Sequence, residues 1–249
     1  MLLAYKLDST NTELFYELAK YYEVSHNTIE KEKFCQKLKS TSLTSALREY
    51  AYNTLVSVEP NGILITYGER DTYPIWILQT LENFRRDVQV LNYDLLQNES
   101  YRTRKSIELG IRFSSKYSSP IEVIKKLAPS NENKSIYYSL TVSHLVLKEH
   151  QSKLYPTGLA LKFSNKNFDN LAVLRTNWEK KFLKHELQKP KVVETDNLLH
   201  LNYILPLIQL LSVYEKESNT QQEVQTKQVI RQLAVLAGKE KEVEQILTK

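Results

Sequence analysis

The feature that most constrains the fold is a change of hydrophobic pattern near residue 60, where helical spacing gives way to short apolar runs. The run from Gly62 to Tyr67 is continuous, as in a strand that is buried on both faces. Strands are also predicted over 88–92, 135–142 and 159–163, with helices over 71–83, 99–113 and 119–127 between them. This alternation predicts an α/β fold with a mainly parallel, Rossmann-like central sheet. Its buried residues should include Ile63, Ile65, Val88, Val90 and Leu140.

Helical spacing occupies both flanks of this region. The N-terminal flank predicts one helix after the capping sequence Thr10–Glu13, and two more from about residue 28 and over 43–58. The C-terminal flank predicts helices from about residues 170 and 198, from the capping sequence Thr220–Glu223, and around 243–247. We therefore predict an N-terminal helical segment (1–59), an α/β domain (60–168) and a C-terminal segment (169–249) that is helical-repeat-like, similar to stacked tetratricopeptide units.

The basic charge of the chain is concentrated in its middle. Residues 61–190 contain 20 basic and 13 acidic side chains, whereas the formal net charge of the whole chain is +5. Such an excess attracts anionic ligands, nucleic acids or lipid surfaces, but it also fits solvated faces on which bases and acids alternate. No basic-aromatic motif of a nucleic-acid-binding module is present, so no specific nucleic-acid partner is predicted.

Several kinds of site are excluded by composition and spacing. The single cysteine, Cys35, excludes an intrachain disulfide framework and is interpreted as a small packed residue. The five histidines lack zinc-binding spacing, and no phosphate-binding loop or nucleophile elbow occurs. We therefore predict no cofactor, no metal, and no hydrolase or transferase activity.

The apolar runs are also too short to span a membrane, and the N-terminus does not have the pattern of a secretory signal. The same pattern would be seen in the mature part of an exported protein. The compartment of the chain is therefore left open by its sequence.

One candidate ligand site lies where the predicted parallel strands end, because ligands of such sheets bind at the carboxyl edge. Polar residues gather at these ends, and close carboxylates there can bind a cation or act as acid and base. The candidate ligand-binding residues are Tyr67, Glu69, Asp71, Thr72, Asn92, Asp94 and Thr141.

A structural interpretation of the same residues is equally concrete. Asp71 or Thr72 is then the N-cap of the following helix, Asn92 and Asp94 shape a turn, and Glu69 pairs with Arg70 or Arg86. We expect Asp71 to be mainly such a cap.

The stretch from Ser57 to Gln79, with its turn Gly68-Glu69-Arg70-Asp71-Thr72-Tyr73-Pro74, resembles part of a large bacterial family. These are the protein O-mannosyltransferase-like membrane glycosyltransferases common in Bacteroidetes-type bacteria. Their soluble C-terminal region has a strand, a Gly-Asp-Asn-Asp-Thr-Phe-Pro-like turn and a helix with an aromatic residue and Gln. Residues 86–92, 137–142 and 158–162 are similar to the family's following strands, so the resemblance covers about residues 45–165.

The resemblance implies an accessory domain, since the family's membrane helices, which hold the sugar-transfer chemistry, are absent from this sequence. Glu69 and Arg70 replace the acidic and amide pair of the family's turn. The first function hypothesis is a non-catalytic module that binds a protein partner, as part of a cell-envelope or secretion-related assembly. If the chain belongs to a larger exported protein, we expect it in the periplasm or at the envelope. The alternative is a ligand-binding or catalytic α/β domain that uses the edge around Glu69, Asp71 and Asn92.

Overall fold

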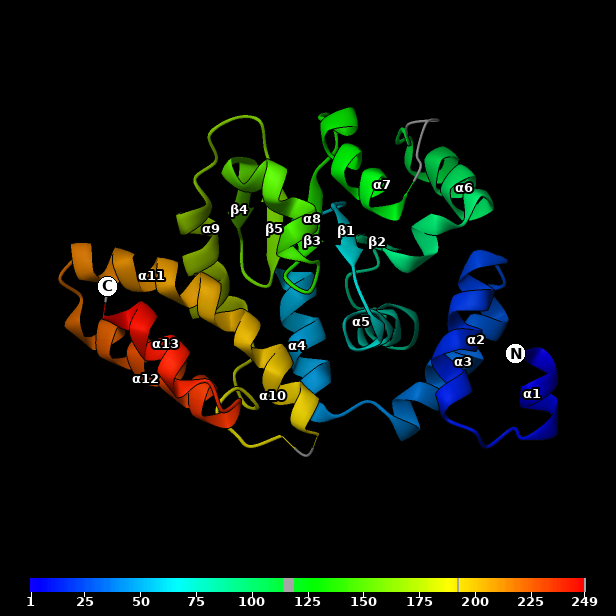
Figure 1. Ribbon diagram of the computed structural model, residues 1–249, viewed down its shortest axis with the longest axis horizontal. Coiled ribbons are helices and arrows are strands. Elements are labelled where there is room, and N and C mark those ends of the chain that lie inside the picture. The colour runs from blue at the N-terminus through cyan, green and yellow to red at the C-terminus, as the bar shows by residue number, and fades with distance from the viewer. Residues whose placement is uncertain (114–118, 192, 249) are drawn as a thin grey trace.

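The computed structural model describes residues 1–113, 119–191 and 193–248, and places one five-stranded sheet among helices (Figure 1). The strands are β1 (Ile63–Thr66), β2 (Gln89–Asn92), β3 (Ile136–Ser139), β4 (Leu154–Pro156) and β5 (Ala160–Phe163). The N-terminal and central helices are α1 (Leu2–Leu7), α2 (Glu13–Val24), α3 (Thr28–Thr41), α4 (Ser45–Val56), α5 (Glu69–Leu81), α6 (Glu99–Leu109), α7 (Pro120–Leu127) and α8 (His144–Leu147). The C-terminal helices are α9 (Asn170–Thr176), α10 (Glu194–His200), α11 (Ile204–Lys216), α12 (Thr220–Leu236) and α13 (Glu240–Leu247).

The sheet has the strand order β2-β1-β3-β5-β4. Strand β1 pairs in parallel with both β2 and β3, so the predicted parallel centre is confirmed. Strand β5 is antiparallel to both of its neighbours, and β4 was not predicted because it is only three residues long and contains Pro156. The sheet is therefore mixed rather than mainly parallel, and the fold as a whole is a mixed α/β fold with flanking helices.

Both faces of the sheet are covered by helices, as the continuous apolar runs predict. Ile63 and Ile65 lie in one core cluster with residues of α2, α3, α5 and α7, whereas Leu64 lies in another with residues of α4 and α5. Two predicted core residues are only half-buried: Val90, because β2 is an edge strand, and Leu140, because it follows the end of β3. Val88 precedes β2 but is buried as predicted.

Helix α4 connects the sheet to the C-terminal helices. Ala51 and Leu55 pack toward the sheet, while Tyr50 belongs to a third core cluster built mainly from residues of α9, α11 and α12. Asn53 fixes this junction: its Nδ2 donates to the carbonyl of Leu183 at 2.8 Å, and its Oδ1 accepts from the Leu183 N–H at 2.9 Å. Helix α4 contributes residues to all three core clusters and lies in the middle of the molecule (Figure 1).

The helix ends agree with the sequence in some places and differ in others. Ser119 Oγ accepts from the N–H of Glu122, as its capping sequence predicts. The capping boxes predicted at Thr10 and Thr220 are wrong. Thr10 donates to Asp8, and the N-cap of the helix that begins at Thr220 is Asn219. In both cases the acceptor for the N–H groups at the start of the helix is a side chain other than that of the predicted threonine.

The C-terminal helices pack in sequence order, with α11 against α12 and α12 against α13 (Figure 1). This arrangement agrees with successive helices joined by short turns. The resemblance to tetratricopeptide units and the three-part division of the chain stay predictions.

Candidate functional site at the carboxyl edge of the sheet

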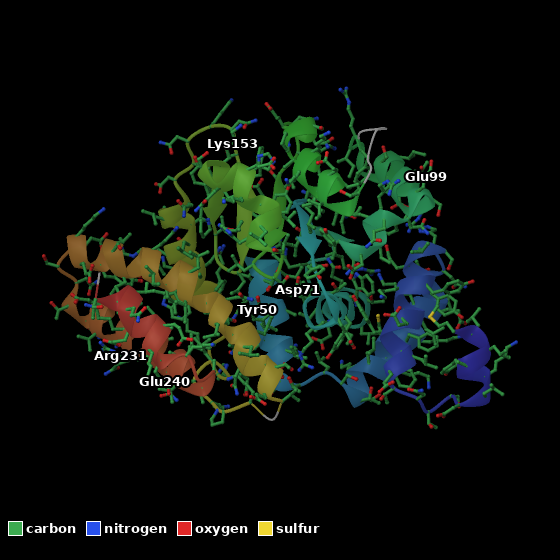
Figure 2. All side chains as sticks on the ribbon, in the orientation of Figure 1. Tyr50, Asp71, Glu99, Lys153, Arg231 and Glu240 are labelled. Carbon is green, nitrogen blue, oxygen red and sulfur yellow. The ribbon has the colours of Figure 1, made fainter. Side chains whose placement is uncertain are left out.

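The carboxyl ends of β1, β2 and β3 lie together at one edge of the sheet, as their parallel pairing requires. Helix α5 begins immediately after β1 at Gly68, whose φ of 79° allows a sharp exit from the strand. The first turn of α5 therefore returns over the strand ends with Asp71 and Thr72. Figure 2 shows Asp71 in the middle of the molecule, where it is 2% exposed.

Asp71 is the centre of a buried hydrogen-bond network. Its Oδ2 accepts from the backbone N–H of Tyr67 at 3.0 Å and from the Thr141 hydroxyl at 2.7 Å, and its Oδ1 accepts from Ser139 Oγ at 3.0 Å. Burial raises the pKa of Asp71 to about 6, against the opposing effect of these three hydrogen bonds. The predicted N-cap role is wrong, because the N-cap is Gly68 and Asp71 is the third residue of the helix. The carboxylate instead joins β1 to the turn after β3.

Thr72 and Asn92 form a second network on the other side of β1. Asn92 Nδ2 donates to Thr72 Oγ1 at 2.9 Å and to the Tyr16 hydroxyl at 3.3 Å. Thr72 Oγ1 donates to the Gly68 carbonyl at 2.8 Å and lies 2.9 Å from Thr66 Oγ1. These side chains are buried, so the network binds α2, α5 and β2 together rather than facing solvent.

Glu69, Asp94 and Tyr67 form the outer part of the edge. Tyr67 is 44% exposed, and its ring contacts that of Tyr93 edge-to-face, with 5.2 Å between the ring centres. Partial burial raises the pKa of both Glu69 and Asp94, and the charge of Glu17 acts in the same direction on each. These carboxylates thus share a region with Glu17 of α2, and they do not join the networks of Asp71 and Asn92.

The sequence did not identify three members of the networks: Thr66, which lies at the end of β1, Tyr16 and Ser139. Tyr16 comes from α2 and looks like an ordinary core aromatic, since nothing in its surroundings along the chain links it to strands that lie far away. The predicted strand over 135–142 places Ser139 in its interior, but β3 ends at Ser139, so its hydroxyl lies at the edge. The early end of the strand is the signal that was missed.

Arg70 connects this edge to the C-terminal helices. Its guanidinium donates to Asp196 Oδ1 of α10 through Nη2 and through Nε at 3.0 Å, and Thr44 donates to Oδ2 of the same carboxylate at 2.9 Å. Asp196 is fully buried, so its charge requires these partners. Arg70 is one of the two residues that depart from the turn of the resembling family, and here it has a structural partner.

Few of the polar groups at this edge are free to contact a ligand. The lone pairs of Asp71 that face its neighbours are occupied, and a carboxyl group with a pKa near 6 can exchange protons with a substrate only where a substrate can reach it. Within 1–113, 119–191 and 193–248, no three His, Cys, Asp or Glu side chains are placed to hold a metal ion. Four cavities of about 340 to 880 Å³ lie elsewhere on the described surface, and none is lined by the seven candidate residues.

The fold and the edge define a class: a mixed α/β domain with a closed sheet edge, supported by helices on both sides. The family model named TMEM260-associated domain 2 matches residues 47–246, and the chain belongs to this family. The match extends over the strands, the edge and the C-terminal helices. Neither the comparison with curated proteins nor that with solved structures gave a match. Among the helices of the described chain, none has the length and apolar character needed to cross a bilayer.

Proposed function

We propose that this chain is a non-catalytic accessory module that binds a protein partner in a membrane-associated glycosyltransferase assembly of the cell envelope. The family name associates the domain with TMEM260. The resemblance of residues 45–165 to protein O-mannosyltransferase-like proteins of Bacteroidetes suggests the class of enzyme it accompanies. In this proposal the membrane enzyme performs sugar transfer, and this chain supplies a binding surface.

The observation that carries the proposal is the internal use of the polar groups at the sheet edge. Asp71 accepts three hydrogen bonds from protein groups and is 2% exposed. Asn92 and Thr72 are likewise buried and bonded to each other. A catalytic carboxylate must reach the reacting atoms, whereas these groups are buried and hydrogen-bonded between strands and helices.

The test combines an activity assay with a binding assay on the full chain. Purified protein, given an activated mannose donor and acceptor peptides, is expected to transfer no sugar. The tagged chain, expressed in its own cells and photo-crosslinked, is expected to co-purify with the O-mannosyltransferase-like membrane protein, detected by a specific antibody.

Sugar transfer by the purified chain that is lost in Asp71→Asn, with an unchanged melting temperature, would overturn the non-catalytic proposal. Absence of the membrane protein from the crosslinked material would overturn the proposed partner. The first result would favour the alternative, a catalytic edge.

One observation favours a narrower form of that alternative, in which the edge binds a ligand. Tyr67 is exposed beside the carboxylates of Glu69 and Asp94, and the side chains of all three lie outside the buried networks. A ligand at this place would be read by Tyr67 and the two carboxylates, not by Asp71 or Asn92. Loss of ligand binding in Tyr67→Ala, with Asp71→Asn unaffected, is the pattern this alternative requires.

A further inference from the structure

A polar groove of about 540 Å³ lies between α12 and the chain from the end of α9 onward. It combines side-chain amides, one aromatic ring and charged groups. Its lining residues are Arg175, Trp178, Glu179, Lys184, Gln188, Asn219, Gln222, Gln225, Thr226, Gln228 and Val229. The groove belongs to the C-terminal helical part and is separate from the sheet edge.

The α12 wall of the groove presents a row of amides. Gln222, Gln225 and Gln228 follow one another at intervals of three residues, which corresponds to steps of about 4.5 Å along a helix. Within the described chain, the side chains of these three glutamines make no hydrogen bond. A row with both donors and acceptors is chemically complementary to the N–H and C=O groups of a peptide main chain.

The opposite wall carries two cations, of which one is paired and one is not. Arg175 is neutralised by Glu179 and by Glu217, at 2.9 and 2.8 Å. Lys184 lies over the Trp178 ring, with its Nζ 4.5 Å from the ring centre, and it forms no ion pair with any described residue. This cation is therefore available to an acidic group of a ligand that occupies the groove.

The same wall disfavours a sugar. Glycan binding commonly uses an open aromatic face, but Trp178 is only 7% exposed and Lys184 covers its ring. The amide row and the unpaired cation fit a peptide main chain that carries a carboxylate.

We infer that this groove binds an extended acidic peptide segment of a partner protein, with the amides of α12 pairing with its main chain and Lys184 with its carboxylate. The inference rests on the proposed function and deepens it, because it places the partner-binding surface in the C-terminal helices. The glutamine row spans about 9 Å, enough for about three residues of extended chain.

The experiment selects random peptides displayed on phage against the full chain. Peptides recovered on the wild-type protein are expected to be enriched in Asp and Glu. The most enriched peptide, labelled with fluorescein, should bind roughly tenfold more weakly to Lys184→Glu in fluorescence anisotropy, as expected when a close charge pair is reversed. Lys166→Glu is the matched control, since Lys166 is exposed, outside the groove and also without an ion pair among the described residues.

A second variant tests the main-chain contacts. Gln222→Ala with Gln225→Ala should also weaken the labelled peptide, and N-methylation of the peptide backbone should weaken it on the wild-type chain. Melting temperatures within the wild-type range confirm that the variants are folded.

The inference is overturned if no acidic enrichment appears, if Lys184→Glu and Lys166→Glu bind alike, or if a glycan array rather than the peptide pool gives binding that depends on Lys184. The proposed function is tested separately by crosslinking of the wild-type chain. If Lys184→Glu co-purifies the membrane protein at the wild-type level, binding through the groove is refuted but the accessory role is retained.

Discussion

Replacing Asp71 with asparagine should make the protein less sensitive to rising pH. The folded state holds the proton of Asp71 more tightly than the unfolded state, because burial raises its pKa from 3.8 to about 6. The stability associated with this group is therefore fully present below the unfolded pKa and is lost as the pH rises through the folded pKa. Asparagine, which does not titrate, resembles the protonated acid at every pH.

The size of the effect follows from the two pKa values. Each unit of difference corresponds to about 1.4 kcal/mol, so the rise from 3.8 to about 6 corresponds to about 3 kcal/mol. Asparagine can retain the contacts: its carbonyl oxygen can accept from Tyr67 and Thr141, and its amide can donate to the Ser139 hydroxyl. Asp71→Ala, in contrast, leaves these donors without an acceptor and should cost about 1–3 kcal/mol near pH 4.

The assay is urea unfolding followed by tryptophan fluorescence, for wild type and variant, at pH values from about 4 to 7. The stability difference between them should move by about 2 kcal/mol in favour of Asp71→Asn over this range, because at pH 4 the unfolded-state carboxyl is already partly ionised. This comparison isolates Asp71 from all other titrating groups. Asp94→Asn is the control, because that carboxyl lies on the same edge but is only half-buried and should give a smaller change. A difference that is constant with pH, or one that moves in favour of the wild type, would refute the reasoning.

Further substitutions test the junction with the C-terminal helices. Burial lowers the pKa of His200 to about 4, so the stability that its neutral form contributes is lost as the pH falls from about 6.5 to 4. In urea unfolding at the acidic end of this range, His200→Phe should be more stable than wild type by up to about 3 kcal/mol. Asn53→Leu removes the hydrogen bonds to Leu183 and should cost about 2–4 kcal/mol in the same assay; a cost below that of an ordinary surface change would contradict the role of this junction. Gly158→Ala should lower the melting temperature far more than Gly238→Ala, because its Cβ would lie 2.2 Å from Ser57 Oγ while the space at Gly238 is open; equal shifts would contradict this.

The sequence predicted the elements whose signal is local. The runs of β1, β2 and β3 are apolar and continuous, and each is followed by polar residues and a helical pattern, so their positions and parallel pairing could be inferred. Strand β4 has three residues and no periodicity, and its pairing with β5 depends on the turn around Gly158. Such a strand is defined by its partner rather than by its own residues.

The sequence predicted where the candidate edge lies, but not that its side chains are buried. The strand ends do bring Asp71, Thr72, Asn92 and Thr141 together. Their burial comes from elements that are distant in sequence, since Tyr16 of α2 covers Asn92. From sequence spacing alone, a carboxylate in the first turn of a helix has the same pattern as a cap and as a catalytic group. Only the identity of its donors, one of them on β3, distinguishes an interstrand connection from both.

The groups available to a partner therefore lie in another part of the molecule. In parallel α/β sheets the carboxyl edge is the usual ligand site, because helix N-termini and strand ends leave polar groups unpaired there. Here Arg70 in the first turn of α5 pairs with Asp196, and the polar side chains at the strand ends are bonded to each other in the two buried networks. A groove lined by side chains without a hydrogen bond or ion pair among the described residues lies instead on α12 and at Lys184, in the C-terminal helices. A partner that binds this chain through polar contacts should therefore be sensitive to substitutions in the groove and insensitive to Asp71→Asn.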